Sequence, residues 1–286
     1  MTGTFTERAI LLGRQKSLVG ILTRPAAAAR TDDPAIVILN TGIVHRVGHH
    51  RMYVTLSRAL ANAGRTVMRF DFAGIGDSDP ESEGLSPLDS NIADIKDALD
   101  LLERDCQVSR VVLIGLCSGS DNAVLYGHND PRVVGLVLMD PSIPPTARYY
   151  FHYIVQRVTH VRNWISLMTG RSGLLRTLLT QLRHGARSPQ EREEFTLDDV
   201  HYSPHLARCY KESIEHGMQM LAVFTVSSPR QTYRGQMIDA FPDVSFKDQL
   251  KMAFFPDSDH LFSVEKDRSR LTQVILQWLR DTTYRR

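Results

Sequence analysis

Short apolar runs rich in β-branched residues alternate along the chain with segments whose apolar residues recur every three or four positions. The runs are apolar throughout rather than at every second residue, which is typical of strands buried on both faces of a parallel sheet. The pattern therefore predicts strands at Leu18–Leu22, Ala35–Leu39, Thr66–Phe72, Arg110–Leu116, Val133–Met139, Met220–Val226 and Lys251–Phe255.

Helices are predicted between these strands. Residues 51–63, 88–103 and 118–126 have the apolar spacing of helices, and a last helix is expected from an N-cap at Ser263 to about Leu279. Strands that alternate with helices in this way indicate an α/β fold with a mostly parallel central sheet flanked by helices.

The interval 141–218 interrupts the alternation. It holds no convincing strand, and strands resume after it. We interpret it as a helical cap inserted into a core of residues 1–140 and 219–286; an independent helical domain is the alternative. Its expected helices are Tyr149–Val158, Val161–Met168, Leu174–Arg183 and Ser203–Gly217.

Composition excludes several classes of protein. The 286 residues are 42% hydrophobic and 23% charged with a formal net charge of +2, as in ordinary globular proteins. No basic stripe suggests nucleic acid. The three cysteines, Cys106, Cys117 and Cys209, are too scattered for a disulfide framework or a zinc site. We therefore expect no metal and no cofactor.

The sequence gives no sign of a membrane protein. No stretch approaches the roughly 20 apolar residues of a membrane-spanning helix. The first residues lack the apolar segment of a signal peptide, so we expect a cytoplasmic location.

The pattern Gly115-Leu116-Cys117-Ser118-Gly119 lies between a predicted buried strand and a predicted helix. It has the form of a nucleophile elbow with cysteine in the place of the usual serine, and the small flanking residues let the backbone double back closely. The helix that follows points its amino end at the site, where it stabilises an anion. A chance match with a buried core thiol is the alternative. Ser118 and Ser120 are weaker candidates because the elbow projects its middle residue.

His260 is the expected general base. It follows the predicted strand Lys251–Phe255 and a polar loop, and it stands just before the last helix, a placement that no other of the eleven histidines has. The alternative is an ordinary exposed loop histidine.

The segment Asn40-Thr41-Gly42-Ile43 is a strand end followed by a glycine turn, where a second oxyanion donor is expected. We assign the donors to the N–H groups of Ile43 and Ser118, with Gly42 as an alternative to Ile43. His45 and Arg46 are candidates for binding a substrate carboxylate or phosphate. A solvated loop rich in His and Arg is an equal alternative.

These features together resemble the α/β-hydrolase superfamily over nearly the whole chain. The resemblance is carried by the turn at Gly42, the run Phe70-Asp71-Phe72-Ala73-Gly74-Ile75-Gly76-Asp77-Ser78, the elbow at Cys117 and the loop at His260. The cysteine elbow is similar to that of hydrolases associated with exosortase systems, and in chemistry to dienelactone hydrolases and Dieckmann cyclases.

The chain departs from the family in one respect. The orienting Asp usually follows the strand here predicted at Met220–Val226, but no carboxylate occurs there before Asp239. A known variation places the acid one strand earlier, where Asp140 ends the strand Val133–Met139. We expect Asp140 to complete the triad, with Asp257 and Asp259 as lesser candidates.

The expected function is acyl transfer from an ester or thioester through an S-acyl enzyme, as in a thioesterase, esterase or acyltransferase. The substrate is a small acyl compound, for which an acyl carrier protein or coenzyme A is a suitable carrier. A Dieckmann-type cyclase that forms a C–C bond and a non-catalytic binding protein are the alternatives. The sequence leaves a homodimer open.

Overall fold

The structure is a computed structural model, and it describes residues 5–13, 16–26, 33–146, 148–149, 197–225 and 233–284. The chain divides into two compact units. The first comprises Met1–Ser142, Leu206–Pro229 and Asp243–Arg286, and the second comprises Ile143–His205 and Arg230–Pro242. All the candidate site residues belong to the first unit.

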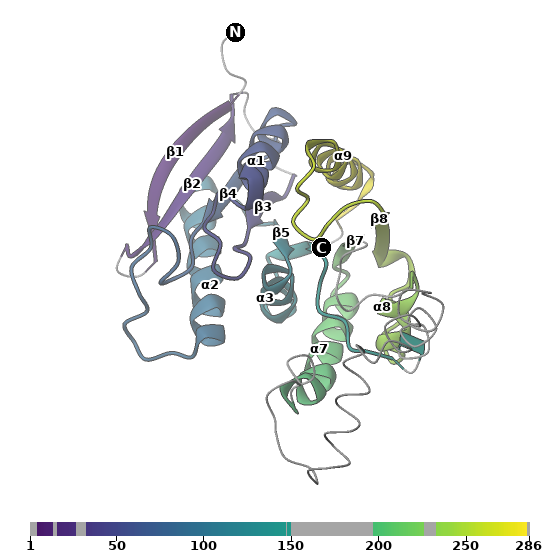
Figure 1. The fold of residues 1–286 in the computed structure, drawn as a ribbon. Helices are drawn as coiled ribbons and strands as arrows, with labels where there is room; N and C mark the ends of the chain where they lie inside the picture. Colours follow the sequence, from purple (N-terminus) through teal and green to yellow (C-terminus); the bar gives the residue numbers. More distant parts are fainter. Residues whose placement is uncertain are drawn as a thin grey trace, which may run out of the picture. The chain divides into compact units, whose positions relative to one another are not determined.

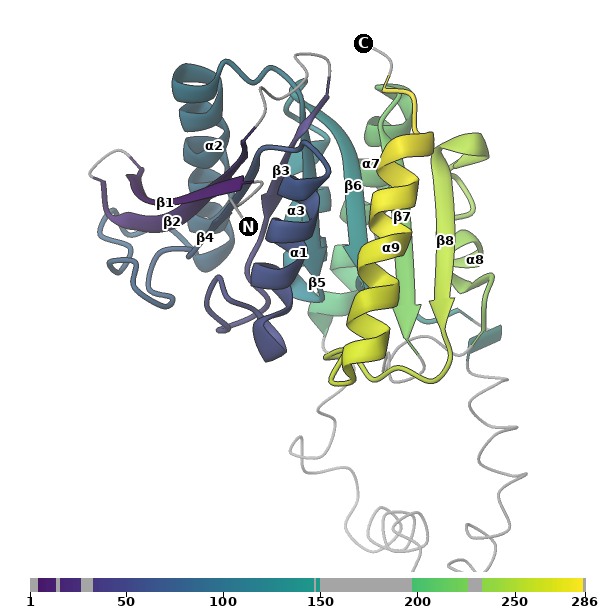
Figure 2. The same cartoon turned by 90° about the horizontal axis from the view of Figure 1, so that it is seen from above.

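In the described part of the chain, eight strands form one sheet in the order β1-β2-β4-β3-β5-β6-β7-β8 (Figures 1 and 2). The pairs β1–β2 and β2–β4 are antiparallel, and every other pair is parallel. The strands are β1 (Phe5–Leu12), β2 (Leu18–Pro25), β3 (Ala35–Ile38), β4 (Val67–Phe70), β5 (Val111–Leu116), β6 (Val133–Met139), β7 (Gln219–Thr225) and β8 (Leu250–Phe255).

The seven predicted strands correspond to β2–β8. The central strands β3, β4, β5 and β6 are buried at every residue, as their continuous apolarity indicated. The edge strand β1 was not predicted, because most of its side chains are exposed and it includes charged residues.

Helices cover both faces of the sheet. Figure 1 shows α1 (Met52–Asn62) and α9 (Glu265–Asp281) on one face, with α2 (Pro87–Cys106) and α3 (Ser118–Gly127) on the other. Short helical turns are η1 (His49–Arg51), α8 (Gln236–Ala240) and η2 (Lys247–Gln249). The core between the sheet and the first pair of helices includes Ile36, Ile114, Leu60, Ile275 and Trp278.

The last helix starts slightly later than expected. Its N-cap is Val264, which is extended, so the prediction of Ser263 was wrong by one residue. The Ser263 N–H instead donates to the Asp259 carboxylate at 3.0 Å, inside the turn that leads into the helix.

Of the predicted cap helices, Ser203–Gly217 coincides in part with α7 (Leu197–Glu215). The other three lie wholly or largely outside the described residues. The predicted cap, 141–218, and the second compact unit have different boundaries, since α7 crosses from one unit to the other at Leu206.

The parallel strands bring their carboxyl ends to one edge of the sheet. Asn40 follows β3, Asp71 follows β4, Cys117 follows β5 and Asp140 follows β6, while the loop with His260 follows β8. Ligands of open α/β sheets bind at this edge, so the topology gathers the candidate residues where a site is expected.

Candidate active site

Cys117 occupies a strained turn between β5 and α3. Its φ and ψ are 54° and −122°, an uncommon conformation for a residue with a side chain. A Cβ at Gly115 would lie 2.1 Å from the backbone carbon of Gly119, and one at Gly119 would lie 2.5 Å from the Asn40 carbonyl oxygen. Both glycines are therefore required by close backbone approach.

Hydrogen bonds hold the elbow in this conformation. The Cys117 N–H donates to the Met139 carbonyl at 2.9 Å, and the Cys117 carbonyl accepts from the N–H of Ser120 at 2.8 Å. The Ser120 hydroxyl is fully buried and bonded to backbone groups of Gly115 and Met139. Ser120 is thus a structural residue of the elbow, whereas the Cys117 side chain is half-buried.

Asp140 and His260 are in direct contact. The Nδ1 atom of His260 lies 2.8 Å from Oδ2 of Asp140, and the Asp140 side chain is almost completely buried. The same carboxylate accepts the Thr225 N–H at 2.8 Å and the Thr225 hydroxyl at 2.6 Å. Two donors of Thr225 therefore orient the carboxylate, and the carboxylate orients the imidazole.

Two neighbours raise the pKa of His260 to about 10. The hydrogen bond to Asp140 is the larger cause, a hydrogen bond to the Cys117 side chain is the second, and burial opposes both. The imidazole is therefore connected to the sulfur on one side and to the carboxylate on the other.

The two lesser acid candidates lie elsewhere. The Asp259 carboxylate accepts the N–H groups of Leu261 and Ser263, and these bonds to the Ser263 and Leu261 backbone lower the pKa of Asp259. Asp257 is exposed. Asp140 is the carboxylate that contacts His260. The histidine therefore has an acidic partner although the loop after β7 lacks the Asp that the family usually has there.

The turn after β3 lies against the elbow. Val44 donates its N–H to the Thr41 carbonyl at 2.9 Å, which closes the turn around Gly42 and Ile43. The Gly42 N–H donates to the Ser118 hydroxyl at 2.8 Å, so it is already engaged. Among the described residues, neither the Ile43 N–H nor the Ser118 N–H donates a hydrogen bond in a turn, loop or cap, and their role as oxyanion donors stays a prediction.

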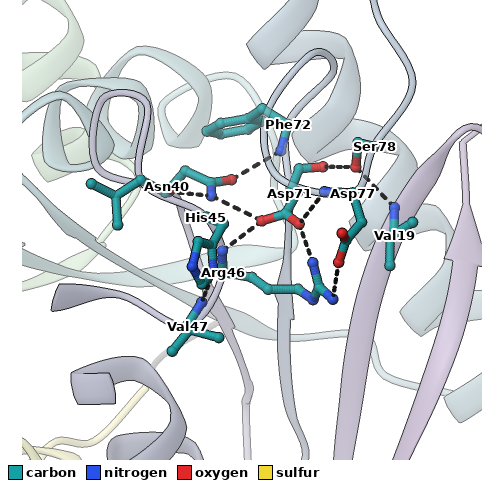
Figure 3. A network of polar contacts seen from close by, with 10 residues as sticks. Val19, Asn40, His45, Arg46, Val47, Asp71, Phe72, Asp77 and Ser78 are labelled. Carbon is teal, nitrogen blue, oxygen red and sulfur yellow. Dashed lines mark hydrogen bonds and ion pairs between the residues drawn. The ribbon is translucent and has the colours of Figure 1, made fainter. Parts of the chain in front are cut away.

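Arg46 binds carboxylates of the protein itself (Figure 3). Its guanidinium pairs with the buried Asp71 and, at 2.6 Å, with Asp77. These pairs raise the pKa of Arg46, although burial opposes them. We therefore do not retain Arg46 as a substrate ligand. His45 is exposed, and its Nδ1 accepts the Val47 N–H at 3.3 Å.

Asp71 is a structural centre to which the sequence analysis gave no role of its own. Its fully buried carboxylate accepts from the Asn40 amide at 3.3 Å, the Arg46 N–H at 2.5 Å and the Asp77 N–H at 3.2 Å (Figure 3). It thereby joins the turn after β3 to the glycine-rich turn after β4. The position of an Asp at the end of a buried strand was the available signal.

Within the described ranges, no group of three His, Cys, Asp or Glu side chains is arranged to hold a metal ion. In the same residues, no helix has the length and apolarity needed to cross a bilayer.

The strand order, the elbow and the histidine loop define the α/β-hydrolase fold. The family model of the serine aminopeptidases, S33, matches residues 34–227, and the chain belongs to that family. In this chain the residue at the middle of the elbow is cysteine. No curated protein is significantly similar in sequence.

Solved structures share the fold at low sequence identity. A hypothetical protein from Pseudomonas aeruginosa has a TM-score of 0.61 and 15% identity, covering 99% of this chain and 95% of that one. The esterase domain of a Rhodothermus marinus protein has a TM-score of 0.58 and 15% identity over 97% and 98%. An α/β serine hydrolase homologue from Coxiella burnetii has a TM-score of 0.57 and 14% identity over 95% and 96%.

The elbow glycines give a stability prediction. Gly115→Ala would push a methyl group into the Gly119 backbone, so we expect a loss of about 2–3 kcal/mol in the free energy of unfolding. Gly235→Ala is the control, because its Cβ would meet only the Tyr233 ring at 3.8 Å; we expect a change within about 0.5 kcal/mol. Urea denaturation measures both, and equal effects would contradict the steric argument.

A second prediction concerns pH. The pKa of His260, about 10 in the folded protein, exceeds its ordinary value of 6.5, so the folded state binds this proton more tightly than the unfolded chain does. The resulting stabilisation is complete below about pH 6.5 and is lost as the pH rises toward 10. Urea denaturation over this range should show a steeper decline for the native protein than for His260→Gln. If the free energy of unfolding declined equally steeply with pH in both proteins, the raised pKa of His260 would be contradicted.

Proposed function

We propose that the protein is an acyl-transfer hydrolase that cleaves an ester or thioester through an S-acyl intermediate on Cys117. The observation that carries the proposal is the hydrogen-bonded series Cys117–His260–Asp140 at the carboxyl edge of the sheet. Membership of a hydrolase family supports the reaction class. The proposed nucleophile is cysteine, where the family has serine.

In the first half of the reaction, His260 holds the proton of the Cys117 thiol, and the sulfur attacks the carbonyl carbon of the substrate. The carbonyl π electrons move to oxygen, and the N–H groups of Ile43 and Ser118 bind the oxyanion. When the carbonyl re-forms, the bond to the leaving group breaks. The departing thiolate or alkoxide takes the proton from His260, and the acyl group remains on sulfur.

In the second half, water or another nucleophile attacks the thioester while His260 accepts its proton. The carbon–sulfur bond breaks, the product leaves and Cys117 recovers its proton from His260. Thioesters suit this route because exchange of one thioester for another is nearly isoenergetic. An acyl group on coenzyme A or on an acyl carrier protein is therefore the substrate class that we propose. Analysis of the products shows whether water or another acyl acceptor is the nucleophile.

The acyl enzyme is the direct test. Incubation with a chromogenic aryl thioester, followed by acid quench, intact-mass measurement and peptide mapping, should find one acyl group on Cys117. Cys117→Ala should lose the adduct, and kcat/KM should fall by roughly 10⁴-fold or more. Cys106→Ala is the matched control, because Cys106 is also half-buried but its sulfur accepts a hydrogen bond from the Arg24 guanidinium at 2.7 Å.

The outcomes separate the alternatives. An adduct on Cys106 or Cys209, or no adduct with any thioester of a coenzyme A and carrier-protein panel, would contradict the proposal and favour a binding protein. A cyclised product released from an acylated Cys117 would identify the Dieckmann-type alternative. Release of the free acid or of a transferred acyl group would support hydrolysis or acyl transfer.

The acid gives a separate prediction. Asp140→Asn keeps the shape of the side chain but removes the charge that the imidazolium faces, and we expect kcat/KM to fall about 100-fold. The loss should be smaller than in a serine enzyme, because a thiol needs less help from its base. Asp259→Asn is the control and should stay within about threefold of the native enzyme. Equal activity of Asp140→Asn and native protein would exclude Asp140 from the triad.

A further inference from the structure

The tip of the turn after β3 is held by hydrogen bonds more than by packing. Gly42 and Ile43 are exposed, and a Cβ added at Gly42 would meet nothing within 4 Å. The Gly42 N–H reaches the Ser118 hydroxyl at 2.8 Å, and the Thr41 hydroxyl reaches the Tyr53 hydroxyl at 2.6 Å. These two bonds therefore determine where the tip lies.

Both bonds lead to the elbow. Ser118 follows Cys117 directly and is the first residue of α3. Tyr53 belongs to α1, is almost completely buried and is also hydrogen-bonded with the backbone of Leu116, the last residue of β5. The turn is thus joined to the residue before Cys117 and to the residue after it.

The base of the turn is held separately. The Asn40 amide donates to the Val44 carbonyl at 2.7 Å and to Asp71 at 3.3 Å, and Asp71 also accepts the Arg46 N–H (Figure 3). This network fixes both ends of the turn to the sheet. It leaves the peptide between Gly42 and Ile43, whose N–H is the assigned oxyanion donor, to be placed by Ser118 and Tyr53.

We propose that Ser118 and Tyr53 are positioning residues that set the distance between the Ile43 and Ser118 N–H groups and thereby preorganise the oxyanion site. The inference rests on the proposed function. The Ser118 hydroxyl bonds to Gly42 and the Tyr53 hydroxyl to Thr41, and both residues would act through that turn. Donors that are fixed before the reaction stabilise developing charge without reorganisation, and loss of one whole donor costs about 10²–10³ in kcat. A displaced donor should cost less.

The test compares two reactions of the same sulfur. Acylation of Cys117 by an aryl thioester develops an oxyanion, whereas its alkylation by iodoacetamide does not. For Ser118→Ala we expect the single-turnover acylation rate to fall roughly 10- to 100-fold, with the alkylation rate of Cys117 within about twofold. Ser118→Thr retains the hydroxyl and should recover most of the acylation rate.

The Tyr53 bond is tested from both of its ends. Tyr53→Phe and Thr41→Val each remove one hydroxyl with little change of shape, so each should slow acylation about tenfold. The double variant should be no slower than either single one, because all three lack the same bond. Thr55→Val is the control on α1; its hydroxyl bonds only to local backbone of the same segment, and acylation should be unchanged.

The outcomes are distinct. Acylation within twofold of the native rate in Ser118→Ala and Tyr53→Phe would overturn the inference while leaving the proposed function intact. Parallel losses of acylation and alkylation would also overturn it, because they would show damage to Cys117 and His260 rather than to the oxyanion donors. A native protein that is alkylated but never acylated at Cys117 would overturn the proposed function and the inference with it.

Discussion

The close approach of the first turn of α3 to the ends of β3 and β5 is the constraint on which the site depends. The helix can come this near only because Gly115 and Gly119 have no side chains. The chain must then reverse sharply, and Cys117 takes up the reversal with a positive φ. One steric condition thus leaves the sulfur accessible and places the Ser118 N–H, at the amino end of α3, beside it, where the proposed mechanism needs a developing negative charge to be stabilised.

Much of this arrangement could be predicted from the sequence, because its signals are local. A buried strand, a Gly-x-Cys-x-Gly pattern and a helix are contiguous, so the elbow is readable. The strands β2–β8 are readable because continuous apolarity reports burial on both faces. The edge strand β1 lacks that signal, since most of its side chains are exposed. The N-cap of α9 depends on a backbone angle at Val264 that residue preferences do not set.

Contacts between distant residues could not be predicted in the same way. Arg46 was a candidate substrate ligand because of its place in the turn after β3, yet Asp71 and Asp77, 25 and 31 residues later, pair with its guanidinium. In the sequence, Tyr53 is one of the apolar residues of the helix predicted at 51–63. The contact of its hydroxyl with Thr41 depends on how α1 packs. The choice of Asp140 came from the resemblance, through the known variation that places the acid one strand earlier, because a contact with His260 across 120 residues leaves no local signal.

The origin of the acidic partner has a consequence for how such an enzyme diversifies. Asp140 is anchored at the end of β6 by two bonds from Thr225 of β7, and His260 follows β8. The second compact unit, Ile143–His205 and Arg230–Pro242, contributes none of Cys117, His260 or Asp140. Mutation, insertion or exchange within that unit therefore leaves these three residues and the contacts of Asp140 with Thr225 and His260 in place. The residues of the proposed reaction and the residues of the second unit are encoded in separate stretches of the chain, so the two are free to evolve at different rates.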